Sequence, residues 1–139
     1  ADEVIDPLET DPVEYITSET NGGVDTVFEV AGVKQTVNQA LQTTKSGGTT
    51  TIVSLFEEGI EINPNDIVMP EQAVVGTAAY EGGPLSGREF GTTLRNFGTG
   101  AFNPEPLVTS RIALNDIVEE GFEALLDEGR EEVKILVEP

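Results

Sequence analysis

The fold of this chain is decided by the stretch Val24-Asp25-Thr26-Val27-Phe28-Glu29-Val30-Ala31-Gly32. This largely apolar, β-branched run closes on a small Ala-Gly pair, a pattern typical of a buried strand in a sheet that helices cover on both faces. A helical pattern follows, then Gly47-Gly48, and then a second buried strand from Thr49 to Ser54. Strand, helix and strand with a crossover of this length predict parallel pairing through a right-handed connection. The sequence therefore predicts an α/β fold that holds half of a nucleotide-binding sheet and lacks its phosphate loop.

Further short elements are predicted around these two strands. Val4-Ile5 is a very short strand candidate, and Asp11, followed directly by a proline, predicts the capped start of a helix that ends near Ser18. Gly47-Gly48 is predicted to end the helix between the two strands. That helix is predicted to gather its apolar residues on one face: Val33, Val37, Ala40 and Leu41.

The second half of the chain continues with strand and helix patterns. Ala73 to Ala79 is the third long strand candidate, and Ser86 begins a predicted helix that Gly98 ends. Asn115 is predicted to cap a last helix that Gly129 ends. Two more strands are predicted at 107–112 and 133–137. The aligned apolar residues of these helices are Phe90, Leu94 and Phe97 in the first and Val118, Phe122 and Leu125 in the second. A break at Gly82-Gly83-Pro84 divides the chain into two predicted parts, 1–83 and 84–139.

The charge of the chain excludes several classes of partner. Acidic residues number 26 against 7 basic ones, which gives a formal net charge of −19 spread along the whole sequence. A polyanion of this kind is expected to bind neither nucleic acid nor an anionic membrane surface, and no segment approaches the ~18 apolar residues of a spanning helix. A disordered acidic chain would lack the apolar periodicity seen here, so a folded protein adapted to concentrated salt is the favoured interpretation.

The residue types that are missing narrow the chemistry further. The chain holds no Cys and no His, so it can supply neither a thiolate nucleophile, nor an imidazole base, nor an N/S-ligated zinc site by itself. The glycine pattern of a dinucleotide fingerprint is absent, since Gly98-Thr99-Gly100 follows a helix and has Asn103 in the third position. No secretory segment opens the sequence, and a cytoplasmic location is therefore expected.

The carboxyl ends of the predicted parallel strands are the candidate binding edge, because ligands lie there in such sheets. The three strand ends are Val30-Ala31-Gly32, Val53-Ser54-Leu55 and Gly76-Thr77-Ala78. Small residues at these positions would let a flat ring approach the backbone closely. The alternative is that all three are ordinary strand ends without a binding role.

Five segments carry a resemblance to a known family. They are residues 1–7, Gly23 to Gly32, Glu61 to Val68, Val75-Gly76-Thr77 and Val133 to Val137. In order and spacing these segments resemble the C-terminal half of a medium-chain, zinc-dependent alcohol dehydrogenase, within the subgroup of 2,3-butanediol and other polyol dehydrogenases. The acidic composition suggests a haloarchaeal member.

The resemblance implies the C-terminal part of a Rossmann doubly wound parallel sheet, in residues 1–83, with a segment that returns to the catalytic domain, in residues 84–139. It also implies an enzyme that oxidises a secondary alcohol or vicinal diol to a ketone with NAD. In the family, the zinc ligands, the proton relay and the glycine fingerprint lie upstream of the segment that matches Ala1. No catalytic or metal-binding residue is therefore expected in this chain, which is predicted to be inactive alone.

The resemblance also assigns cofactor contacts. It implies that Val30, Ala31 and Gly32 border the adenosine ribose, and that the strand end at 53–55 lies near the nicotinamide ribose. The third strand end, formed by Gly76, Thr77 and Ala78, would lie beside the nicotinamide. Lys134 matches a position at which the family often places a basic residue that reaches the pyrophosphate. The alternative is that Lys134 is a solvent-facing charge.

Other functions and an assembly state also follow from these patterns. In a doubly wound sheet the Val4-Ile5 strand would lack its neighbour, and the strand at Val24 would show an unpaired apolar edge that invites pairing. The segments 60–62 and 67–69 resemble the family's subunit contact, so a homo-oligomer, a dimer or tetramer, is expected.

The alternative functions are a zinc-free quinone or enoyl reductase of the same superfamily and a non-enzymatic nucleotide-binding or assembly module.

Overall fold

The computed structural model describes residues 1–77, 86–127, 129 and 131–139. The chain forms two compact units, residues 1–81 and residues 82–139. Whether these units are a coenzyme domain and a returning catalytic segment, divided after residue 83, stays a prediction. No helix within the described ranges has both the length and the apolar composition that crossing a bilayer requires.

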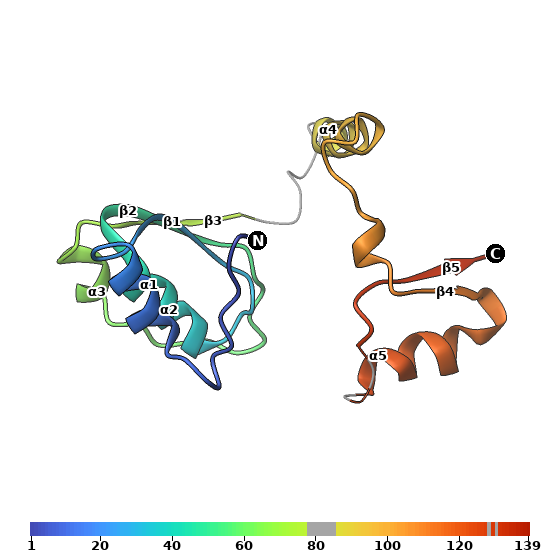
Figure 1. Ribbon diagram of the computed structural model, residues 1–139, viewed down its shortest axis with the longest axis horizontal. Helices are drawn as coiled ribbons and strands as arrows, with labels where there is room; N and C mark the ends of the chain where they lie inside the picture. The colour runs from blue at the N-terminus through green and yellow to red at the C-terminus, as the bar shows by residue number, and fades with distance from the viewer. Residues whose placement is uncertain (78–85, 128, 130) are drawn as a thin grey trace. The chain divides into compact units, whose positions relative to one another are not determined.

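The first unit holds a parallel sheet with helices packed on it (Figure 1). Its elements follow in the order α1 (Pro12–Glu19), β1 (Val24–Glu29), α2 (Lys34–Thr43), β2 (Thr44–Ile52), α3 (Asn65–Val68) and β3 (Ala73–Gly76). The strands lie in the order β1-β2-β3, and both pairings are parallel. The predicted α/β fold with parallel strands is confirmed. The predicted third strand is shorter than expected within the described residues, and its predicted end at Ala79 lies outside them.

The core of this unit forms where α2 packs on the sheet. Val37, Ala40 and Leu41 are buried, as the predicted helical face requires. Val33 is 51% exposed, because it precedes the first turn of α2 in an extended conformation and so leaves the buried face. The described residues provide helices for one face of the sheet, and a helix layer on the other face stays a prediction. In Figure 1 the helices of this unit lie on one side of the sheet, and Phe28 is 65% exposed.

The end of α2 differs from the prediction, because threonines rather than glycines end this helix. The Thr43 hydroxyl donates to the Gln39 carbonyl oxygen at 2.8 Å, and the Thr44 hydroxyl donates to that of Ala40 at 2.8 Å. These bonds satisfy carbonyl groups of the last turn, and β2 begins directly at Thr44. The glycines that were predicted to end the helix therefore lie inside β2.

Gly47-Gly48 instead forms an irregularity in the pairing of β1 with β2. The register advances from Val24 opposite Thr44 to Thr26 opposite Thr49, so β2 bulges between them. A Cβ atom at Gly48 would lie 2.9 Å from the Lys45 carbonyl oxygen and 3.0 Å from that of Asp25. Only glycine lets the two strands approach this closely at the bulge.

The N-terminal segment confirms one prediction and contradicts another. Asp11 caps α1, since its carboxylate accepts hydrogen bonds from the backbone N–H groups of Val13 at 2.8 Å and Glu14 at 3.2 Å. The expected strand at Val4-Ile5 does not form. A strand needs a paired neighbour, and the described sheet of this unit contains only β1, β2 and β3.

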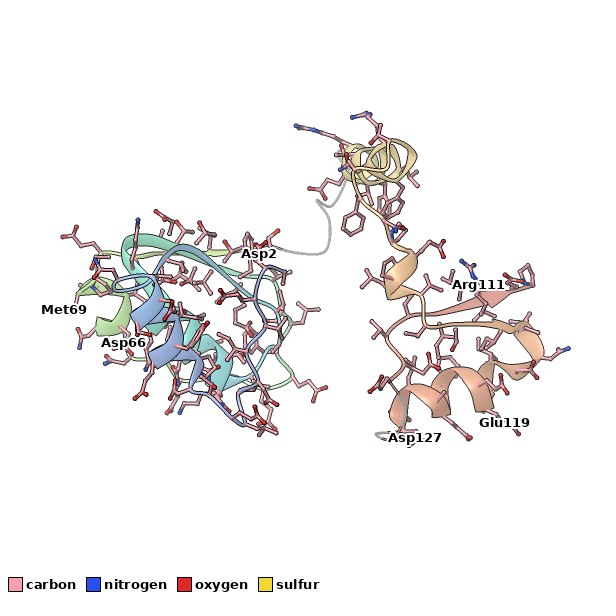
Figure 2. The ribbon with its side chains drawn as sticks, viewed as in Figure 1. Asp2, Asp66, Met69, Arg111, Glu119 and Asp127 are labelled. Carbon is pink, nitrogen blue, oxygen red and sulfur yellow. The ribbon has the colours of Figure 1, made fainter. Side chains whose placement is uncertain are left out.

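Replacing Asp11 by alanine should therefore destabilise the unit, because two N–H groups of the first turn lose their acceptor. The expected loss in the free energy of unfolding is about 1 kcal/mol. Urea unfolding followed by circular dichroism measures this loss. Asp2→Ala removes the same charge from an exposed position and should leave the unfolding midpoint unchanged (Figure 2). An equal loss in both variants would show that net charge, rather than capping, sets the effect.

The second unit holds a two-stranded parallel sheet with helical segments. It comprises α4 (Ser86–Gly98), a 3-10 turn (Glu105–Leu107), β4 (Ser110–Ala113), a 3-10 turn (Leu114–Asp116), a π-helical segment (Ile117–Glu123), α5 (Ala124–Leu126) and β5 (Ile135–Glu138). β4 pairs with β5 in parallel. The predicted helix that ends at Gly98 is confirmed. The strand predicted at 107–112 begins only at Ser110, since a 3-10 turn ends at Leu107.

The last helical segment differs most from its prediction. Asn115 does not cap it, since this residue lies inside a 3-10 turn that shows no side-chain capping bond. The helix ends at Leu126 rather than at Gly129. Ile112, Gly121 and Ala124 form the buried contact of this unit. A π-helical turn rotates the residues away from the 3.6-residue spacing on which the prediction depended. The predicted apolar row is exposed: Val118, Phe122 and Leu125.

Candidate functional site

The three predicted strand ends lie next to one another in the first unit. Parallel register places Glu29 opposite Ile52, and Ile52 opposite Gly76. The pairing continues beyond the strands, because the Val53 N–H donates to the Glu29 carbonyl oxygen at 2.9 Å and the Thr77 N–H donates to that of Ile52 at 3.0 Å. The structure therefore brings together residues 30–32, 53–55 and 76–77. Ala78, the last predicted residue of this edge, lies outside the described residues.

An open groove lies beside two of these strand ends. Its volume is about 730 Å³. The groove is lined by Ala31, Gly32, Val33, Lys34, Leu55 and residues 57–61. Ala31, Gly32 and Leu55 are thus predicted contact residues that line it, whereas Val30, Val53, Ser54, Gly76 and Thr77 do not. Three of its lining side chains are glutamates and one is a lysine, so the groove is polar and mostly acidic.

Gly32 is the point where the first two strand ends touch. Its φ angle is 76°, in the left-handed region, and a Cβ atom there would lie 2.6 Å from the Leu55 carbonyl oxygen. Both the backbone conformation and the close approach require glycine. The loop after β1 is therefore in backbone contact with the loop after β2.

A buried carboxylate joins the same two loops. Glu29, the last residue of β1, is 2% exposed. Its Oε1 atom accepts hydrogen bonds from the N–H groups of Ala31 at 2.9 Å and Gly32 at 2.8 Å and from the Thr36 hydroxyl at 2.7 Å. Its Oε2 atom accepts a hydrogen bond from the Ser54 hydroxyl. We call this carboxylate with its four donors the Glu29 bridge.

The hydrogen bonds of the bridge decide the charge of Glu29. Burial by itself raises the pKa of this carboxyl group, but the donors from Ser54, Thr36, Gly32 and Ala31 outweigh burial and hold the pKa below its ordinary value. A lowered pKa in the folded state means that the ionised carboxylate stabilises the fold above the pKa of the unfolded chain. This stabilisation is lost as the pH falls through the folded pKa.

Glu29 was not among the site residues predicted from the sequence, although one signal was available. An acidic residue at the end of an otherwise apolar strand has to find partners if the strand is buried. Its donors lie up to 25 residues away, at Ser54, so the pattern around β1 could not identify them.

Lys134 lies in the second unit, directly before β5. Its side chain is exposed, and its backbone carbonyl accepts a hydrogen bond from the Thr109 N–H at 2.9 Å. The predicted contact between Lys134 and a pyrophosphate stays a prediction.

The residues do not fit a zinc site. The sequence contains neither His nor Cys, and the residues that the structure describes contain no cluster of three or more Asp and Glu side chains that could hold a metal ion. No described residue is therefore assigned a role in binding zinc.

Comparison with known proteins places these features in a family. The family described as "Zinc-binding dehydrogenase" matches residues 1–97. (R,R)-butanediol dehydrogenase from Bacillus subtilis is 44% identical over 137 residues, which are 98% of this chain and 38% of that protein. (R,R)-butanediol dehydrogenase from Neisseria gonorrhoeae is 36% identical over 140 residues, which are 100% of this chain and 38% of that protein. The chain thus spans less than two fifths of the length of these relatives.

Solved structures show the same similarity. The crystal structure of 2R,3R-butanediol dehydrogenase from Bacillus subtilis matches with a TM-score of 0.84 and 45% identity, over 97% of this chain and 37% of that chain. A zinc-binding dehydrogenase from Sinorhizobium meliloti, bound to NADP, matches with a TM-score of 0.76 and 32% identity, over 97% of this chain and 38% of that chain. The source organisms of these relatives do not test the expected haloarchaeal origin, which stays a prediction.

Proposed function

The chain belongs to the family of zinc-binding dehydrogenases, as its sequence predicted, and on this premise we propose that it forms the dinucleotide-binding part of an alcohol or vicinal-diol dehydrogenase. The observation that carries the proposal is the meeting of three strand ends with small residues beside an open groove. The names of the two butanediol dehydrogenases support a diol as substrate. The expected cofactor is NAD, and the NADP-bound relative makes NADP the alternative.

The strand-end residues leave space for a flat nicotinamide ring. A Cβ atom at Gly76 would meet no described atom within 4 Å, so this strand end is open, and Ala31 in the groove is small and exposed. The N–H groups of Ala31 and Gly32 are already bonded to Glu29. These two residues would therefore border a ligand through their remaining atoms rather than donate hydrogen bonds from the backbone.

The role proposed for this chain is positioning. A bound nicotinamide supplies the acceptor for the hydride that leaves the carbinol carbon, while the hydroxyl proton is released. The loops at 30–32, 53–55 and 76–77 hold the dinucleotide and fix the face that it presents. We propose that zinc is bound by a part of the protein outside these 139 residues, and that this chain alone has no activity. The expected homo-oligomer and the cytoplasmic location stay predictions.

Replacing Gly76 by valine tests the assigned edge in the protein as its gene encodes it. We expect the dissociation constant for NAD to rise by at least about tenfold, because the added side chain occupies the open strand end. The free energy of unfolding should change by less than about 0.5 kcal/mol, since no described atom is displaced. Fluorescence titration with NADH and urea unfolding measure the two quantities.

Ala73→Val is the matched control, since it adds bulk to an exposed residue at the other end of β3. Its affinity for NAD should equal that of the unchanged protein. An unchanged affinity in Gly76→Val would remove this strand end from the binding site. Binding without any alcohol oxidation, even with zinc present, would favour a nucleotide-binding module, and reduction of a quinone or enoyl substrate would favour a zinc-free reductase.

A further inference from the structure

The Glu29 bridge joins the loop after β1 and the first turn of α2, which are adjacent in the sequence, to the loop after β2. Its donors are two N–H groups of the loop after β1, the hydroxyl of Thr36 in α2, and the hydroxyl of Ser54 in the loop after β2. The two loops are also in backbone contact, at Gly32 and Leu55. The bridge is therefore a side-chain connection between the two loops whose residues Ala31, Gly32 and Leu55 line the groove.

The burial of Glu29 means that the bridge opposes movement of the two loops. A carboxylate that is only 2% exposed has little access to water, so each oxygen depends on protein donors to offset the loss of hydration. Hydrogen bonds to an ionised acceptor are shorter and about twice as strong as neutral ones. Moving either loop would break one of these bonds and leave a buried charge without a partner, which is far more costly than losing a bond in water.

The bridge also changes the interpretation of Ser54. The sequence predicts this residue as a cofactor contact, but its hydroxyl donates to Glu29 across the sheet. A hydroxyl has one hydrogen, so while this bond exists Ser54 cannot donate to a ligand. Its effect on a dinucleotide would then pass through Glu29 and the loop at 30–32.

We propose that Glu29 is a positioning residue of the dinucleotide site, which sets the two walls of the groove by tying Ser54 to the loop at 30–32 without touching the ligand. This inference rests on the proposed function, because it concerns the same groove. The lowered pKa of Glu29 supports it, since the carboxylate remains ionised at neutral pH.

A double-mutant cycle in the protein as its gene encodes it tests the proposal. Glu29→Gln keeps the size of the side chain but replaces one acceptor oxygen by a donor, and Ser54→Ala removes one donor. Each variant is expected to weaken NADH binding, measured by fluorescence titration, by about tenfold. The double variant should bind no more weakly than Glu29→Gln alone, because Ser54 acts through the carboxylate.

Matched controls remove the same groups elsewhere. Glu119→Gln changes an exposed glutamate on the π-helical segment, which Figure 2 labels, and Ser46→Ala changes an exposed serine in β2. Both should leave the affinity for NADH unchanged. Thermal unfolding of every variant separates a change in the folded site from a loss of folded protein.

The outcomes are distinct. If the losses of the two single variants multiply, the double variant binds NADH about a hundredfold more weakly than the unchanged protein. This result would mean that Ser54 contacts the dinucleotide directly, and it would overturn the proposal. Lowered thermal midpoints with unchanged affinity would show a merely structural role and also overturn it. If Glu29→Gln does not fold, Thr36→Val removes another donor of the carboxylate from a residue that does not line the groove, and an unchanged affinity in this variant overturns the proposal whereas a clear loss supports it. If the unchanged protein binds no dinucleotide, the proposed function itself fails.

Discussion

Replacing Val37 by asparagine is expected to lower the free energy of unfolding of the first unit by about 4 kcal/mol. Val37 is 2% exposed in the contact between α2 and the sheet. The variant loses about 2 kcal/mol of apolar burial, and an amide without a partner costs about 2 kcal/mol more in the same place. Urea unfolding, followed by far-ultraviolet circular dichroism, measures the loss.

The same substitution four residues earlier should have the opposite sign. Val33 is the N-cap residue of α2, with extended backbone angles and no side-chain capping bond, and it is 51% exposed. Asparagine is a favourable N-cap, so Val33→Asn is expected to stabilise the unit by about 0.5 to 1 kcal/mol. Neither change alters the net charge. Similar losses in both variants would contradict the burial pattern of α2.

Replacing Gly32 by alanine is expected to lower the free energy of unfolding by about 3 kcal/mol and to weaken dinucleotide binding at the same time. The left-handed backbone accounts for about 1 kcal/mol, and the approach of 2.6 Å between the new Cβ atom and the Leu55 carbonyl oxygen accounts for about 2 kcal/mol. The carbonyl belongs to backbone and cannot rotate away. The loops after β1 and β2 would have to separate, which widens the groove that they line.

Gly47→Ala is the matched control for this prediction. Gly47 has nearly the same φ angle, 75° against 76°, but a Cβ atom there would meet nothing within 4 Å. We expect the Gly47→Ala variant to lose about 1 kcal/mol of its free energy of unfolding and to keep its affinity for NADH. Urea unfolding and fluorescence titration give both quantities for the two variants. Equal losses in stability would mean that backbone strain alone, without contact between the loops, explains the role of Gly32.

Local patterns predicted the features that depend on neighbouring residues. A proline directly after Asp11 identified the capped start of α1, and apolar residues at 37, 40 and 41 identified the buried face of α2. The apolar run at 24–30 identified β1 and its parallel pairing. The family was predicted from the resemblance of five segments, and four of these lie within the matched residues 1–97.

The predictions that failed involve competition between local signals and partners elsewhere. Gly47-Gly48 is a common helix terminator, but the Thr43 and Thr44 hydroxyls end α2 first, and the glycines are needed where β1 approaches β2. Asn115 is a common cap, but the chain around it enters a 3-10 turn and then a π-helical segment. Which of two local signals is used depends on packing that the pattern does not contain.

The sequence by itself determined the order of the elements, the parallel strands, the family and the edge of the sheet that carries the candidate site. Tertiary structure alone decided that Glu29 faces Ser54 across 25 residues and that Gly32 touches Leu55. The physical reason is the range of the interactions. Helix caps and apolar faces depend on residues three or four positions apart, whereas the bridge depends on the register of two strands, which only the folded sheet fixes.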